Sequence, residues 1–105
     1  MAEALQRWKW TVAYDGATYE GWQSQPSGNT IQDALEHALA EMNGMPTETR
    51  VHGSGRTDAG VHADGQVCHV DTPMRLHLDA QSWPRAMNAR LPASIRILEA
   101  EPVSD

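Results

Sequence analysis

Apolar and polar residues alternate along residues 7–14, and this period of two predicts a strand with one buried face. The apolar positions of that strand are Trp8, Trp10, Val12 and Tyr14. After Thr30 the period lengthens, and apolar side chains recur along one stripe of an amphipathic helix. Thr30 suits the N-cap of this helix, and residues 43–44 (Asn-Gly) suit its end. We expect Glu36 and Glu41 to lie on the solvated side of the helix.

The rest of the chain predicts two shorter strands, a second helix and a last strand. The strands are expected within residues 49–55, 66–72 and 94–103, the last with Ile95, Ile97 and Leu98 at its apolar positions. Ser82 is expected to cap the second helix, with Pro84 in its first turn. Its inward-facing side chains are expected to be Trp83, Met87 and Leu91.

The resulting order, β-α-β-β-α-β, predicts an α+β fold of the ferredoxin-like type. Four antiparallel strands would form one sheet, and the two helices would cover one face of it. The other face would stay open for a ligand or for another domain.

Composition fits a single folded domain over residues 1–105, with 40% hydrophobic and 21% charged residues. Cys68 is the only cysteine, which excludes an internal disulfide and a cysteine zinc cluster. The N-terminus has no apolar signal segment, and no apolar run approaches the roughly 18 residues of a membrane span. We therefore expect a cytoplasmic protein without membrane contact. The net charge of −6 by itself argues against binding to nucleic acid.

Residues 53–66, "GSGRTDAGVHADGQ", concentrate turn formers and charge between two predicted strands. Gly53, Gly55 and Gly60 permit positive φ or a close backbone approach. Arg56 would keep the nearby Asp58 carboxylate ionised, which suits a nucleophile. The alternative is that Asp58 caps a turn and Arg56 is a solvated charge, and the residue types alone favour that alternative.

The whole string "GRTDAGVHA" followed by "GQ" resembles the signature of the TruA family of tRNA pseudouridine synthases. The resemblance continues in "YDGATYEGWQSQP", "TIQDALEHAL" and "NARLPASIRI", in order and over nearly the whole chain. It implies that Asp58 is the catalytic nucleophile of an isomerase that converts uridine to pseudouridine in the anticodon stem-loop of tRNA. It also implies that no cofactor or metal is needed. The target base must leave the stack to be reached, and Arg56 would fill its place and pair with a phosphate or with Asp58.

Other residues of these motifs are candidates for substrate contact. Thr57, Gln23 and Gln25 are expected to contact RNA, and His62 either fixes the loop, contacts RNA or is an exposed imidazole. Tyr14 and Trp22 are expected to pack in the core rather than to stack on bases. His52, His62, His69 and Cys68 fit no zinc-ligand spacing, so no metal site is expected.

Members of the family resemble two such domains around a cleft, and this chain corresponds to the first. A second domain would supply a tyrosine, a basic residue and most of the RNA-binding surface, which would reconcile the acidic charge with an RNA substrate. We expect the 105 residues alone to fold but to have little activity, and the full-length protein to form a homodimer. A non-catalytic RNA-binding module is the alternative, although residues 66–72 lack the aromatic side chains of an RNA-stacking platform. A small ferredoxin-like domain that acts by oligomerisation or binds a small ligand is a third.

Overall fold

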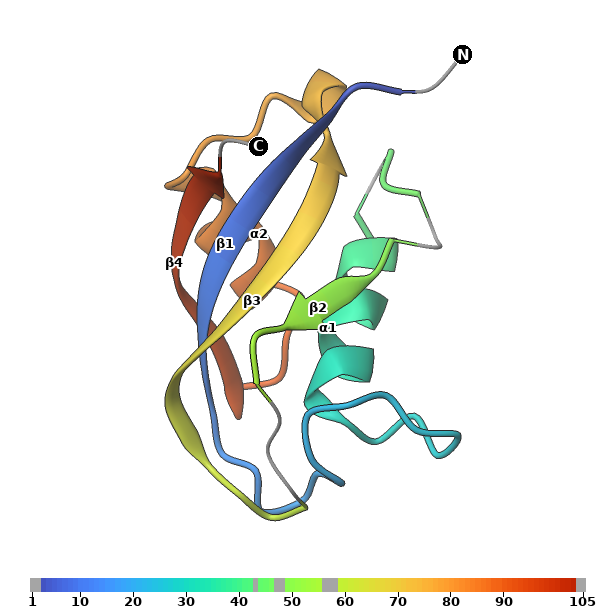
Figure 1. The fold of residues 1–105 in the computed structure, drawn as a ribbon, viewed down its shortest axis with the longest axis vertical. Helices are drawn as coiled ribbons and strands as arrows, with labels where there is room; N and C mark the ends of the chain where they lie inside the picture. Colours follow the sequence, from blue (N-terminus) through green and yellow to red (C-terminus); the bar gives the residue numbers. More distant parts are fainter. Residues whose placement is uncertain (1–2, 43, 47–48, 56–58, 104–105) are drawn as a thin grey trace.

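The computed structural model describes residues 3–42, 44–46, 49–55 and 59–103. Its regular elements are β1 (Leu5–Tyr14), α1 (Ile31–Ala40), β2 (Val51–Gly53), β3 (Ala63–Pro73), α2 (Ser82–Asn88) and β4 (Ile95–Val103), with a short 3₁₀ turn at Met74–Leu76. The strands form one antiparallel sheet in the order β2-β3-β1-β4, with both helices behind it in Figure 1. The predicted α+β fold and element order are confirmed.

The core lies between the sheet and the two helices, where the alternation of β1 places its large apolar side chains. Trp8, Trp10, Val12 and Tyr14 are all buried, as are Trp83, Met87 and Leu91 around α2. The Trp83 ring lies 5.5 Å from that of Trp10 and 6.3 Å from that of Trp8, both tilted. Such aromatic packing dominates the apolar area of a small core. The predictions for these side chains are therefore confirmed.

The sequence predicted the N-cap of α1 correctly but not that of α2 (Ser82–Asn88). Thr30 is the N-cap of α1, and its hydroxyl accepts from the Asp33 N–H at 3.1 Å, as expected. The expectation that Ser82 caps α2 was wrong, because Ser82 is its first residue. The carboxylate of Asp79 instead accepts from the N–H groups of Gln81 at 3.1 Å and Ser82 at 2.8 Å. Hydrogen bonds from Ser82 lower the pKa of Asp79.

All three apolar residues named for the last strand lie in β4, whose pairing with β1 contains a bulge at Leu98. Thr11 pairs with Glu99 and Val12 with Ile97, so Leu98 has no partner on β1. An extra residue of this kind shifts the inside-outside alternation by one position. Leu98 is 55% exposed, as alternation from the buried Ile95 and Ile97 requires, and the bulge leaves Glu99 exposed as well before Ala100 is buried.

Polar residues of α1 fix the loop before the helix and the strand after it. Glu36 was expected to be solvated, but its side chain is only 16% exposed. Its carboxylate accepts from the Val51 N–H at 2.9 Å and lies 3.2 Å from the Arg50 guanidinium. The side chain of Gln32 accepts from the Ser24 N–H and donates to the Val51 carbonyl. The start of β2 is therefore positioned by α1, a long-range role that periodicity cannot reveal.

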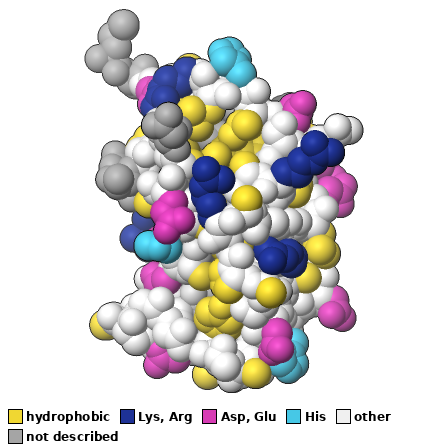
Figure 2. Space-filling model, turned by 180° about the vertical axis from the view of Figure 1, so that it is seen from behind, with side chains coloured by type: hydrophobic (Ala, Val, Ile, Leu, Met, Phe, Trp, Pro, Cys, Tyr) yellow, Lys and Arg dark blue, Asp and Glu magenta, His cyan; other side chains and the backbone are white. Residues whose placement is uncertain are grey.

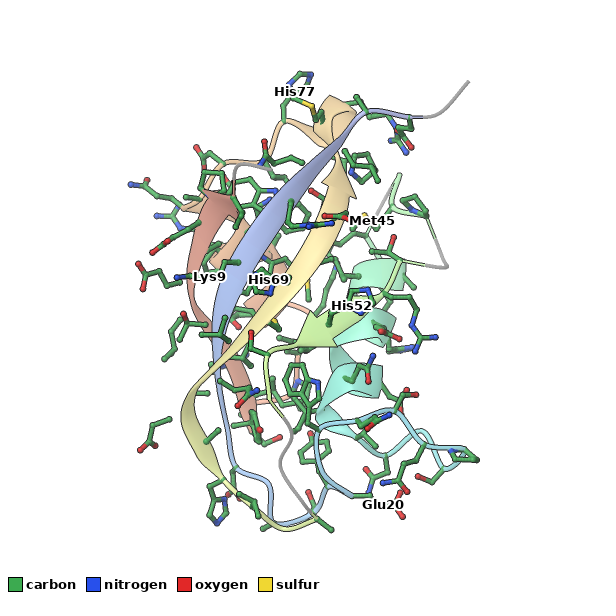
Figure 3. The ribbon with its side chains drawn as sticks, viewed as in Figure 1. Lys9, Glu20, Met45, His52, His69 and His77 are labelled. Carbon is green, nitrogen blue, oxygen red and sulfur yellow. The ribbon has the colours of Figure 1, made fainter. Side chains whose placement is uncertain are left out.

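The two faces of the molecule differ in their surface chemistry. On the open face of the sheet, where Lys9, His52 and His69 project (Figure 3), Arg7 binds Asp71 through two contacts of 2.9 and 3.2 Å. The hydrogen bond from Arg7 lowers the pKa of Asp71. On the helix side, basic and acidic side chains lie interspersed (Figure 2). Within the described residues, no helix is long and apolar enough to cross a membrane.

Candidate active site

The predicted nucleophile Asp58 and its neighbours Arg56 and Thr57 lie outside the described residues. Their roles therefore stay predictions. The chain is described on both sides of them, and we call residues 53–55 the upstream arm and residues 59–62 the downstream arm. The way in which these arms are bound defines the frame around the predicted nucleophile.

The upstream arm continues β2 and lies against a buried indole. A Cβ on Gly53 would lie 2.4 Å from Nε1 of Trp22, so only glycine fits there, although the neighbour is a side chain and not the expected backbone. Trp22 is 2% exposed and lies 6.2 Å from the ring of Tyr14, which confirms that both aromatics pack. The Ser54 N–H donates to the Val67 carbonyl at 2.9 Å, and Gln66 donates to the Gly55 carbonyl at 3.1 Å.

The downstream arm is bound by the turn that follows β1, through the backbone of Gly16 and Tyr19. The Gly60 N–H donates to the Tyr19 carbonyl at 3.2 Å, and the Gly16 N–H donates to Nδ1 of His62 at 3.0 Å. A Cβ on Gly16 would lie 1.8 Å from the carbonyl oxygen of Val61, a contact that excludes every other residue. Residues 15–22 thus contact both arms, from opposite ends of one short segment.

The three glycines predicted to shape the loop have different conformations. Gly60 has a φ of +79°, in the left-handed region that favours glycine. Gly53 is required by its contact with Trp22. Gly55 shows neither feature: its φ is not positive, and a Cβ there would lie 3.5 Å from its nearest neighbour, an ordinary contact.

Sequence reasoning missed the residues that support the turn itself. The Tyr19 hydroxyl and the Ser94 hydroxyl share a hydrogen bond of 2.9 Å, and the Asp15 N–H donates to the Ser94 carbonyl at 2.8 Å. Gly16 also supports the turn, through its contacts with Val61 and His62. The motif "YDGATYEG" was the available signal, but no local pattern shows that its backbone meets residues 60–62 and 94.

The two arms border separate hollows. A hollow of about 660 Å³ lies where β1 ends and β3 and β4 begin, and its lining includes Asp15, His62, Asp64, Ser94 and Arg96. A smaller one of about 210 Å³ is lined by Trp22, Gln23, Gln32, His52, Gly53 and Gly55. His62 and Gln23, both predicted to contact RNA, therefore lie at different hollows. Gln25 lies at neither, and its side chain donates to the Glu20 carbonyl at 2.9 Å.

The remaining titratable groups do not form a second centre in the part of the chain that the structure describes. No cluster of three or more His, Cys, Asp or Glu side chains there could bind a metal ion. Cys68 is buried, and burial raises its pKa to about 12, so the thiol stays protonated and is a poor nucleophile. His52 and His69 are register partners on β2 and β3.

Comparison with known proteins identifies the family of the chain. The family model described as tRNA pseudouridine synthase matches residues 11–105. The chain is similar to proteins named tRNA pseudouridine synthase A: 56% identical to that of Akkermansia muciniphila over 92% of the chain and 36% of the relative. The identity is 48% with Bacillus subtilis (94% of the chain, 39% of the relative) and 50% with Burkholderia cenocepacia (90% and 33%). The chain spans about a third of the length of these relatives. It belongs to the tRNA pseudouridine synthase family.

Proposed function

We propose that this chain is the N-terminal, catalytic-aspartate domain of a tRNA pseudouridine synthase that acts on uridines of the anticodon stem-loop. The observation that carries the proposal is the convergence of both arms of the "GRTDAGVHA" segment on residues 15–22. A nucleophile needs a fixed position to react efficiently, and a short segment bound at both ends supplies one. Asp58 lies in the sequence between these bound ends.

The reaction is an isomerisation, so it needs no oxidant or reductant. The bond between N1 of the base and C1′ of the ribose breaks, the base turns, and a bond between C5 and C1′ forms, while C5 loses its proton and N1 gains one. The Asp58 carboxylate attacks either the base or the ribose and leaves when the new bond has formed. The target base has to leave the helical stack before Asp58 can reach it.

The other predicted site residues act on the RNA. The planar guanidinium of Arg56 suits both a phosphate and the space of an extruded base, which a lysine would fill less well. Thr57, Gln23, Gln25 and His62 supply further polar contacts. Phosphate contacts provide much of the affinity for RNA, and eight basic against fourteen acidic residues provide few of them. We therefore assign most of the RNA-binding surface to a second domain, assign the full-length protein a homodimer, and expect little turnover by these 105 residues alone.

The alternative, a non-catalytic module that stacks RNA on its sheet, has less support. The aromatic side chains of β1 are buried on the helix side. The open face of β3 presents Val67, His69 and Asp71 instead. Stacking platforms need exposed aromatic rings on that face.

The test is release of tritium from tRNA labelled at C5 of uridine, with the complete protein that contains this chain. Asp58→Asn should abolish release while tRNA binding stays unchanged, because the amide keeps the shape but is no nucleophile. Arg56→Lys should lower the rate at least about tenfold with folding intact, since the charge stays and the fork is lost. Glu41→Gln, an exposed carboxylate on the far end of α1, is the control and should match wild type. Undiminished release by Asp58→Asn would refute the nucleophile assignment.

A further inference from the structure

His62 is the one side chain of the downstream arm that binds the turn after β1. Its Nδ1 accepts from the Gly16 N–H at 3.0 Å, and the same nitrogen lies 3.0 Å from a carboxylate oxygen of Asp15. One ring nitrogen cannot satisfy both neighbours. With a lone pair it accepts from Gly16, and with a proton it donates to Asp15.

The surroundings favour the first of these states. The Asp15 oxygen that faces His62 already accepts from the Ala17 N–H at 3.0 Å, so it has a donor without the imidazole. Among the described residues, the Gly16 N–H has no other acceptor, and a Cβ on Gly16 would overlap the Val61 carbonyl. An acceptor at Nδ1 requires that the ring proton be on Nε2.

We propose that His62, in its Nε2–H tautomer, is a positioning residue for the isomerisation: its Nδ1 binds the Gly16 N–H and thereby fixes the arm that follows Asp58. This inference rests on the proposed function. His62 is 64% exposed at its side chain, so the hydrogen bond contributes more to the placement of the arm than to folding. A shift of the reacting group by about 1 Å can lower the rate about a hundredfold, which makes a single such bond significant.

The neighbour that Nδ1 of His62 binds also depends on the charge of the imidazole. The charged groups that line the hollow beside His62 are Asp15 after β1, Asp64 on β3 and Arg96 on β4. Protonation of the imidazole turns Nδ1 into a donor, and its partner then becomes Asp15 rather than Gly16.

Three variants of the complete protein separate this role from a direct contact with RNA. His62→Leu removes the acceptor, whereas His62→Asn places an oxygen near the position of Nδ1 and cannot be protonated. We expect His62→Leu to lower kcat at least about tenfold with little change in KM for tRNA, and His62→Asn to restore most of it. As a matched control, His69→Leu on the open face of β3 should leave kcat unchanged.

The nitrogen shifts of ¹⁵N-labelled histidine report the tautomer independently of activity. A proton on Nε2, together with a Gly16 amide signal that moves in His62→Leu but not in His62→Asn, is the expected result. A proton on Nδ1, full activity of His62→Leu, or equal loss in both variants would overturn the proposal. The expected tautomer in a wild-type protein that releases no tritium would instead refute the proposed function and leave the hydrogen bond established.

Discussion

The upstream arm packs on an indole that is 2% exposed, whereas the downstream arm is bound through hydrogen bonds to Gly16 and Tyr19, one of them made by the His62 side chain, which is 64% exposed. The Trp22 indole is part of the hydrophobic core, so its support of the upstream arm is lost only when the domain unfolds. The support of the downstream arm consists of hydrogen bonds at the surface, where net contributions to stability are small. The two ends of one predicted catalytic segment are thus fixed by different kinds of interaction.

Because of this difference, the effect of a mutation on the stability of the domain can be separated from its effect on the placement of the downstream arm. Weakening the upstream support should unfold the domain, and activity should fall only as far as the folded population does. Weakening the downstream support should leave the domain folded with a displaced arm. Mutations on the two sides should therefore differ in the ratio of their effects on unfolding and on rate.

The largest effect on stability is expected from Trp22→Ala. Removal of a fully buried aromatic side chain leaves a cavity, and it should lower the free energy of unfolding by about 3–5 kcal/mol. Urea denaturation followed by circular dichroism measures this change. Leu98→Ala, at a large apolar side chain that is 55% exposed, is the control and should stay within about 0.5 kcal/mol of wild type. His62→Leu should also stay within about 0.5 kcal/mol of the wild-type free energy of unfolding. Equal unfolding midpoints for Trp22→Ala and wild type would show that the indole does not support the upstream arm.

The sequence predicted the elements of both supports but not their pairing. Periodicity placed β1 and α1 correctly because burial of one face repeats every two or every 3.6 residues. The contact of Trp22 with Gly53 and that of Gly16 with Val61 join residues 31 and 45 positions apart, and no local pattern encodes such distances. Glu36 looked solvated for the same reason, since its partners Arg50 and Val51 lie outside its helix, at the start of β2.

The candidate site could be predicted from the sequence only through the resemblance of one motif to a known family. "GRTDAGVHA" identified the segment and its family, while the backbone of the turn after β1 gave no chemical signal. The start of α2 was a local error of another kind: the nearby carboxylate of Asp79, rather than the hydroxyl of Ser82, accepts from the first N–H groups. Local sequence thus predicted what is buried, and it failed where a polar side chain or a glycine meets a distant backbone.

A smaller effect tests how the upstream support is itself positioned. Asp33 accepts from Ser24 and Thr30, and its carboxylate is within 3.4 Å of the Gln25 N–H, so it fixes the loop that follows Trp22. Burial raises the pKa of Asp33, but the hydrogen bonds from Ser24 and Thr30 outweigh this and leave it below the usual 3.8. A lowered pKa in the folded state stabilises the fold above the unfolded value, and this contribution is lost as the pH falls through the folded value.

Asp33→Asn should therefore cost about 1 kcal/mol at pH 7 and should reduce the acid-induced loss of stability below about pH 5. Thermal unfolding of both proteins across this pH range measures the difference. Asp71 and Asp79 also have lowered pKa values, and they contribute equally to both proteins, so they cancel. If stability changed with pH in parallel for wild type and Asp33→Asn, the charge of Asp33 would not contribute to the pH dependence of stability.

The smallest effects distinguish the two glycines that lie next to residues 56–58 in each arm. Gly60→Ala should cost about 1 kcal/mol, because a Cβ meets no neighbour there and only the positive φ is unfavourable. Gly55→Ala should be neutral or stabilising by up to about 1 kcal/mol, since its backbone accepts alanine and the unfolded chain loses entropy. Chemical denaturation of the two variants gives the comparison directly. If the two substitutions cost the same, the arms would share one kind of constraint, and the contrast between a packed upstream arm and a surface-bound downstream arm would not hold at residue level.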